Sequence, residues 1–154
     1  MNPLSVYIHI PFCRSKCAYC DFASYPGRED AWEAYFRALF AEIEAASDRE
    51  RRVETIFFGG GTPSAVPFSF IGEALEAVAR AFDVVPGAEI TLEANPGTLT
   101  PEKLAAYRAM GVNRLSIGAQ SFDAALLKDI GRVHTPEDIE PAVPLARAAG
   151  FENV

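Results

Sequence analysis

Short apolar runs alternate along the chain with longer segments whose apolar residues recur at helical spacing. The apolar runs are bounded by Gly, Pro or Asn, which is typical of β-strands, and they cover residues 6–10, 55–58, 90–93 and 115–117. Regular alternation of strands and helices favours a parallel sheet covered by the helices that connect its strands.

The segments between the strands are predicted to be amphipathic helices. In the first, apolar residues form one stripe at i, i+3, i+4, i+7, i+8 and i+11: Trp32, Tyr35, Phe36, Leu39, Phe40 and Ile43. The second helix repeats this pattern over 71–82. Thr100-Pro101 and Thr135-Pro136 each place an N-cap before a proline at the first helical position, so each predicts a further helix.

A weak internal repeat indicates where the chain lies in this architecture. "MGVNRLSIG", at 110–118, is a helix end, a glycine and a strand, and "AGFENV", at 149–154, begins the same transition. The sequence therefore predicts an α/β fold that is part of a larger (β/α) barrel with parallel strands. We expect residues 1–154 to be the N-terminal portion of a single core domain, ending as the fifth strand begins.

Charge and composition narrow the class of partner. The net charge is −7, which disfavours nucleic acid or an anionic membrane as the main partner. "MNPLS" leads directly into an apolar strand without a charged leader or a long apolar span, so we expect a cytoplasmic protein. In a reducing cytoplasm, clustered cysteines are more often metal ligands or redox groups than structural disulfides.

All three cysteines lie in the loop after the first predicted strand, with the spacing CxxxCxxC at Cys13, Cys17 and Cys20. A disulfide uses two thiols and a structural zinc site usually four ligands. A thioredoxin-like Cys17/Cys20 pair leaves Cys13 without a role, and a Cys₃His zinc site needs His9, which lies inside an apolar strand. A 4Fe-4S cluster fits best: three thiolates leave one iron open to a small ligand.

These residues resemble the radical S-adenosylmethionine (SAM) family, whose signature is CxxxCxxC with an aromatic residue before the last cysteine, here Tyr19. The resemblance implies that SAM binds the open iron through its amino and carboxylate groups, and that the reduced cluster cleaves it to a 5′-deoxyadenosyl radical. A low-potential electron donor such as flavodoxin or ferredoxin is then required.

A second motif, "FFGGGTPS", follows the second predicted strand. Its glycines, Gly59, Gly60 and Gly61, can let backbone amides and carbonyls approach a ligand closely. In a parallel barrel this turn and the cysteine loop share the carboxyl-terminal face, where sites form. In the radical SAM family the corresponding motif holds the SAM amino group. A purely structural role is the alternative.

Further motifs resemble the oxygen-independent coproporphyrinogen III oxidase group over essentially the whole chain. They are "YIHIPFC", "CDF", "FFGGGTP", "EITLEANPGTLTPEKL", "GVNRLSIGAQSFD" and "GRVH". The resemblance implies that the following residues contact SAM: Tyr7, Gly60, Gly61, Thr62, Glu93, Gln120 and Arg132. The alternative roles are a core strand for Tyr7, a carboxylate at the top of the barrel for Glu93, a turn for Gln120 and a solvated surface charge for Arg132. Glu93, which ends a strand, is suited to accept hydrogen bonds from ribose hydroxyls.

Two departures separate the chain from the oxidases of this group. The oxidases carry a fourth cysteine where this chain has Phe22, and a longer segment before the first strand. The sequence instead resembles the heme chaperone branch, which binds heme as cargo and delivers it to heme-accepting apoproteins, while the oxidase remains the alternative. We assign no catalytic residue. His134 is a candidate heme ligand, but a loop histidine before a Thr-Pro helix start is expected to be solvent-exposed.

Overall fold

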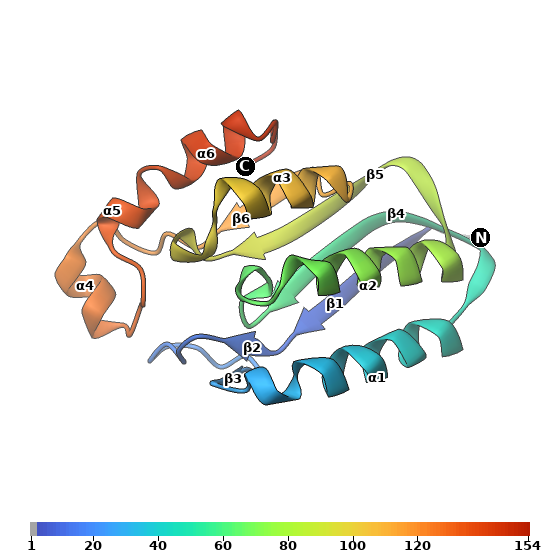
Figure 1. Ribbon diagram of the computed structural model, residues 1–154, viewed down its shortest axis with the longest axis horizontal. Coiled ribbons are helices and arrows are strands. Elements are labelled where there is room, and N and C mark those ends of the chain that lie inside the picture. The colour runs from blue at the N-terminus through green and yellow to red at the C-terminus, as the bar shows by residue number, and fades with distance from the viewer. Residues whose placement is uncertain (1–2) are drawn as a thin grey trace.

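The computed structural model describes residues 3–154 and contains a four-stranded parallel sheet (Figure 1). Its strands are β1 (Leu4–Ile10), β4 (Asp48–Gly60), β5 (Phe82–Ala94) and β6 (Arg114–Ile117), in the spatial order β1-β4-β5-β6. Each strand pairs in parallel with the next. The predicted α/β class and all four predicted strands are confirmed.

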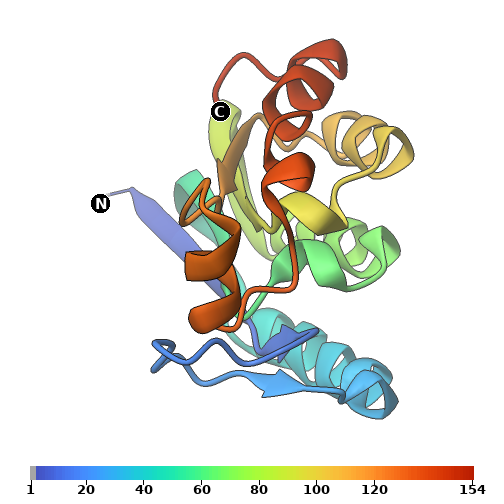
Figure 2. The ribbon, with the colours of Figure 1, turned by 90° about the vertical axis from the view of Figure 1, so that its left-hand side faces the viewer.

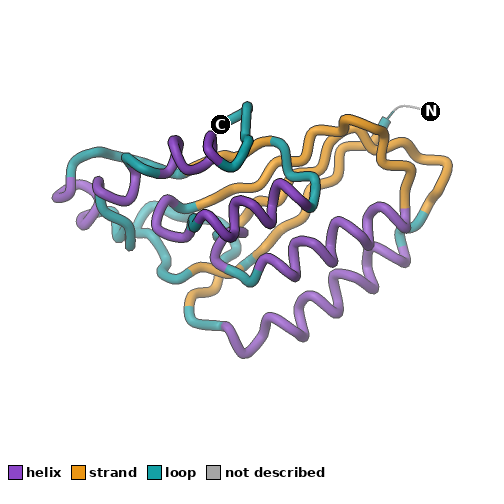
Figure 3. Tube along the Cα trace, turned by 45° about the horizontal axis from the view of Figure 1, so that its top comes forward, coloured by secondary structure: helices purple, strands orange, loops and turns teal. Residues whose placement is uncertain are grey.

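The three longest helices cover one face of the sheet, as Figures 2 and 3 show. They are α1 (Trp32–Ala45), α2 (Phe68–Ala81) and α3 (Pro101–Ala109), and consecutive helices contact one another. Phe36 of α1 stacks on Phe70 of α2 with ring centroids 4.3 Å apart. Burial of such an aromatic stripe in the core is what its helical spacing predicts.

Shorter elements complete the fold. The chain forms two-residue strands β2 (Phe12–Cys13) and β3 (Tyr25–Pro26) and helices α4 (Ala124–Asp129), α5 (Pro136–Ile139) and α6 (Ala142–Ala148), as well as 3₁₀ turns η1 (Glu29–Ala31), η2 (Pro63–Ala65) and η3 (Pro96–Thr98). Among them, α6 packs against α3. Thr100 caps α3 and a capping box at Thr135 begins α5, as predicted. No helix within 3–154 combines the length and apolarity needed to cross a membrane.

All four strands begin before their predicted apolar runs, and β4 and β5 do so by seven and eight residues. The first residues of β4 are the polar run 48–52, and β5 passes through Pro86 and Gly87. The β4–β5 register shifts in both regions, and Gly87 has φ +80°, so these are irregular parts of the ladder that hydrophobicity does not reveal.

The last residues of the chain form a single β-bridge with β6, at the place where a fifth strand is predicted. Arg114 of β6 forms a parallel bridge with Asn153, and the Leu115 amide donates to the Asn153 carbonyl at 3.0 Å. The segment therefore extends the strand order in the same direction beyond β6.

Candidate cofactor site at the carboxyl ends of the strands

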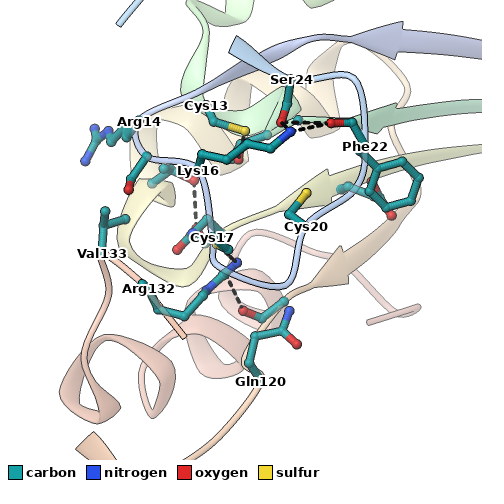
Figure 4. A pocket seen from close by; sticks show the side chains of 18 of the residues that line it. Cys13, Arg14, Lys16, Cys17, Cys20, Phe22, Ser24, Gln120, Arg132 and Val133 are labelled. Carbon is teal, nitrogen blue, oxygen red and sulfur yellow. Dashed lines mark hydrogen bonds between the residues drawn. The ribbon is translucent and has the colours of Figure 1, made fainter. Parts of the chain in front are cut away.

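A cavity of about 260 Å³ lies at the carboxyl ends of the parallel strands. All three cysteines line it (Figure 4). Tyr19, from the same loop, lines it as well. The other predicted residues that line it are Gly60, Gly61, Thr62, Glu93, Gln120 and Arg132. Every predicted site residue except Tyr7 therefore faces one space, although the segments that carry them are far apart in the sequence.

The cysteine loop is held at several points by the rest of the protein. Lys16 Nζ donates to the Phe22 carbonyl at 2.6 Å and to Ser24 Oγ at 3.2 Å, which bridges the two sides of the loop. The Ala18 amide donates to the Ile130 carbonyl at 3.0 Å, at the end of α4. These contacts order the loop with all three thiols free of disulfides.

Donors from distant segments approach two of the sulfur atoms. Thr62 Oγ1 donates to Cys13 Sγ at 3.6 Å, and Arg132 Nη1 donates to Cys17 Sγ at 3.5 Å. The Arg132 contact is drawn in Figure 4. Hydrogen bonds and positive charge beside sulfur tune a metal-bound thiolate, so these contacts suit ligand cysteines.

The glycine turn packs against the cysteine loop. The Gly61 amide donates to the Ile10 carbonyl and the Thr62 amide to the Phe12 carbonyl, both at 2.8 Å, and the Gly60 amide donates to Glu93 Oε2 at 3.3 Å. A Cβ on Gly61 would lie 2.6 Å from the Phe12 carbonyl oxygen. The expectation that these amides approach a ligand is therefore wrong: they bind protein groups, because the glycines admit the neighbouring backbone.

Glu93 lies beside the last residue of β5 and lines the cavity. Burial raises the pKa of its carboxyl group, while the Gly60 amide and the nearby His9 act in the opposite direction. The side chain therefore presents acceptor oxygens in a partly desolvated place, where a hydroxyl or ammonium group is a favourable partner.

Tyr7 and His9, from β1, lie next to this site but do not line the cavity. Tyr7 is 55% exposed, so the alternative of a core position is wrong. His9 Nε2 bonds to the Ala23 carbonyl at 2.8 Å and His9 Nδ1 to Tyr7 Oη at 3.1 Å. A carbonyl only accepts, so Nε2 carries the proton and Nδ1 accepts from Tyr7. Both nitrogens are used, which argues against His9 in a Cys₃His zinc site.

Arg132 joins three parts of the site. Its Nη2 donates to the Gly118 carbonyl at 2.9 Å, and its Nη1 reaches Tyr19 Oη at 3.4 Å as well as Cys17. Burial raises the pKa of the Tyr19 hydroxyl, Arg132 lowers it and Cys17 raises it. Gln120 follows in the same turn with φ +65°. Arg132 is thus a bonded member of the site, and the alternative of a freely solvated charge is wrong.

His134 is buried, with 3% of its surface exposed, so the expected solvent exposure is wrong. Its Nε2 bonds to the Ala119 carbonyl at 3.0 Å and its Nδ1 accepts from Arg132 Nε at 3.4 Å. Burial lowers the pKa of its imidazole. The loop folds back against η3, where His134 Cβ lies 3.4 Å from the position that a Cβ on Gly97 would take. Both ring nitrogens are engaged, and His134 does not present a free heme ligand.

The profile of the Radical SAM superfamily matches residues 7–154. The chain belongs to the radical SAM superfamily. The match includes the cysteine loop, the glycine turn and the strand ends that form the cavity.

Curated radical SAM relatives cover almost all of this chain. It is 42% identical to the heme chaperone HemW of Escherichia coli over 99% of its length and 41% of the relative's. It is 39% identical to HemW of Haemophilus influenzae over 99% of its own length and 42% of that protein. It is also 40% identical to an oxygen-independent coproporphyrinogen III oxidase of Bradyrhizobium diazoefficiens, over 97% of this chain and 34% of that protein. The chain thus spans about two fifths of its chaperone relatives.

Among solved structures, the coproporphyrinogen III oxidase HemN of Escherichia coli, described as a radical SAM enzyme, superposes with a TM-score of 0.90. The two are 32% identical over 97% of this chain and 35% of the oxidase chain. Methylornithine synthase, with a TM-score of 0.56 and 15% identity, shares the fold.

The donor set suits the cluster that the radical SAM superfamily implies. Within residues 3–154, no three His, Cys, Asp or Glu side chains are grouped as ligands of a single metal ion. A 4Fe-4S cluster has a different requirement, because each thiolate ligand binds a separate iron. Three free cysteines spaced along one cavity-lining loop fit that requirement.

Other residues of the radical SAM cavity were not predicted from the sequence. Asn95 and Thr98 follow β5, Ser116 belongs to β6, and Ser24 follows the cysteine loop. The signal that could have found Asn95 is its place two residues after Glu93, because alternate residues of an extended segment share a face.

Proposed function

We propose that Cys13, Cys17 and Cys20 hold a 4Fe-4S cluster with one iron open to SAM. When bound and reduced, such a cluster supplies the electron that cleaves the sulfonium of SAM. The observation that carries the proposal is the convergence of all three cysteines with Glu93 and Arg132 on one cavity.

The protein side chains have separable roles toward SAM. Because the amides of the glycine turn are bonded within the protein, its carbonyl groups are the backbone partners left for the SAM ammonium group. Glu93 accepts hydrogen bonds from the ribose hydroxyls. Arg132 orients Tyr19 and the Cys17 sulfur, and Gln120 contributes a polar amide on the same side. Tyr7, which is exposed beside Glu93, completes the wall when SAM is bound.

We propose further that the protein is a heme chaperone, which delivers heme to heme-accepting apoproteins and takes electrons from a low-potential donor such as flavodoxin or ferredoxin. Its similarity to proteins named heme chaperones supports this. Phe22 supports it too: this side chain lines the cavity where the oxidases carry a cysteine, and it has neither a thiol nor a hydrogen-bonding group.

Anaerobic oxidative decarboxylation of coproporphyrinogen III is the second candidate function. The 0.90 TM-score to HemN and the 40% identity to the Bradyrhizobium oxidase favour it, so identity alone does not separate the two functions. The residue at position 22 favours the chaperone, since phenylalanine cannot replace a thiol in a reaction that uses one.

The experiment compares heme binding with turnover in the purified, anaerobically reconstituted protein. We expect a saturable heme titration, and no protoporphyrinogen IX by mass analysis when SAM, reductant and coproporphyrinogen III are supplied. Phe22→Cys should not create turnover, and Phe122→Cys is the matched control, because Phe122 is an exposed phenylalanine outside the cavity lining. Decarboxylation by the unmodified protein without heme uptake would replace the chaperone proposal with the oxidase.

A further inference from the structure

Asn95 is almost fully buried and yet belongs to the cavity lining. Only 7% of its surface is exposed. Its backbone is extended, with φ −99° and ψ 135°, so it continues β5 and lies on the same side of the strand as Glu93. The small exposed part of Asn95 is therefore the part that faces the cavity.

The hydrogen bonds of Asn95 fix the orientation of its amide. Its Oδ1 accepts from the Gly97 amide at 3.3 Å, as the N-cap of η3. A backbone amide can only donate, so the acceptor atom must point there and Nδ2 must point the other way. Within residues 3–154, Nδ2 donates to no other group, which leaves a side chain that is nine-tenths buried with an unused donor at the cavity wall.

Two sets of donors at this cavity are already used within the protein. The amides of the glycine turn donate to protein acceptors, and the Arg132 guanidinium is shared among Gly118, Cys17 and Tyr19. Within the described part of the chain, the Asn95 Nδ2 donor is unpaired and reaches the cavity surface, so it is available to a ligand that supplies an acceptor.

The backbone of Asn95 indicates which end of the ligand it meets. Its amide donates to Ser64 Oγ at 3.1 Å, and Ser64 lies two residues after Thr62 in the segment that follows the glycine turn. The ammonium group of SAM is proposed to bind at that turn, and the SAM carboxylate is attached to the same carbon as the ammonium group. The acceptor nearest to Asn95 is therefore the carboxylate.

We infer that Asn95 Nδ2 donates a hydrogen bond to the carboxylate of bound SAM, so that Asn95 is a further ligand-binding residue of this site. The inference rests on the proposed SAM site. Asn95→Ser and Asn95→Asp both retain an oxygen that can cap η3, and both remove the donor. The serine variant is neutral, whereas the aspartate variant adds a negative charge near Glu93.

The experiment measures dissociation constants of S-adenosylhomocysteine and 5′-methylthioadenosine for the reconstituted protein. The first ligand has the carboxylate and the second lacks the whole amino-acid portion. A hydrogen bond to a charged group predicts that Asn95→Ser weakens S-adenosylhomocysteine about tenfold and leaves methylthioadenosine unchanged, with a larger loss for Asn95→Asp. Asn113→Ser is the matched control. The Asn113 side-chain amide donates to the Ala88 carbonyl and accepts from the Ile90 amide, both in β5, and Asn113 lies outside the cavity lining.

Three results would overturn the inference. Equal affinity of Asn95→Ser and the unmodified protein for S-adenosylhomocysteine would show that the donor is not used. An equal loss for both ligands would place the contact on the adenosine portion. A loss for Asn95→Asp alone would reflect charge rather than the missing donor. Absence of iron, or of ligand binding, in the unmodified protein would instead refute the proposed function itself.

Discussion

Replacing Gly61 by alanine tests how the glycine turn supports the cysteine loop. The new Cβ would lie 2.6 Å from the Phe12 carbonyl oxygen and 2.9 Å from the Ile10 carbonyl oxygen. Both oxygens belong to backbone that would have to move, and the same two carbonyls accept the Thr62 and Gly61 amides at 2.8 Å. The substitution therefore strains or breaks two hydrogen bonds at the base of the cysteine loop.

The expected cost follows from these contacts. Each lost hydrogen bond contributes about 1 kcal/mol, and inserting a methyl group into a filled space costs about 1–3 kcal/mol, so the free energy of unfolding should fall by about 3–5 kcal/mol. Gly87→Ala is the matched control, because its Cβ would meet open space and only the positive φ of +80° opposes it. That strain costs about 1–2 kcal/mol.

Denaturant unfolding of the two variants and the parent protein gives the comparison, with iron content after reconstitution as a second readout. We expect Gly61→Ala to lose more stability than Gly87→Ala and to bind less iron, whereas Gly87→Ala keeps the parent's iron content. If Gly61→Ala unfolds at the same denaturant concentration as Gly87→Ala and binds the same iron, the proposed support of the loop by the turn is refuted.

Three further substitutions test single groups of the site. Cys17→Ala should abolish cluster iron, measured by iron analysis, because two thiolates remain; unchanged iron would exclude Cys17 as a ligand. The pKa of Glu93 is raised in the folded protein, so its contribution to the free energy of unfolding is complete below the unfolded pKa and is lost as the pH rises through the folded pKa. Glu93→Gln has no such loss, so the ligand-free variant should become more stable than the parent as the pH rises. Equal stability of Glu93→Gln and the parent at every pH would contradict that cause. The pKa of His134 is lowered in the folded protein, so its contribution to stability is present above the unfolded pKa and is lost as the pH falls through the folded pKa. Between pH 7 and 5, the free energy of unfolding of His134→Gln should therefore fall less steeply than that of the parent. An unchanged slope would contradict this prediction.

The main architecture could be predicted because apolar periodicity reports burial directly. The four strands and three longest helices follow runs such as those around Phe36 and Ile90. The polar first residues of β4 carry no such signal. They are mostly exposed and lie before the part of β4 that pairs with β1, so no apolar side chain is needed there. Helix α4 was missed although Asp123, whose carboxylate accepts from the Ala125 and Leu126 amides, is a recognisable N-cap.

The membership of the site could be predicted from motifs, but the internal bonding of the site could not. The glycine turn uses its amides on the cysteine loop, and His134 folds inward onto the Ala119 carbonyl, because segments distant in sequence supply the partners. Asn95 was missed for the same reason: its free donor becomes evident only once Gly97 fixes the direction of its amide.

The most direct test of the proposed cluster, with one iron open to SAM, is the electron paramagnetic resonance spectrum of the reduced, reconstituted protein before and after addition of SAM. About four irons per chain, and a cluster signal that changes when SAM is added, are expected if three thiolates hold a cubane with one open iron. Tightly bound zinc without iron would contradict the proposed cluster. A cluster signal that SAM leaves unchanged would contradict the binding of SAM to its open iron.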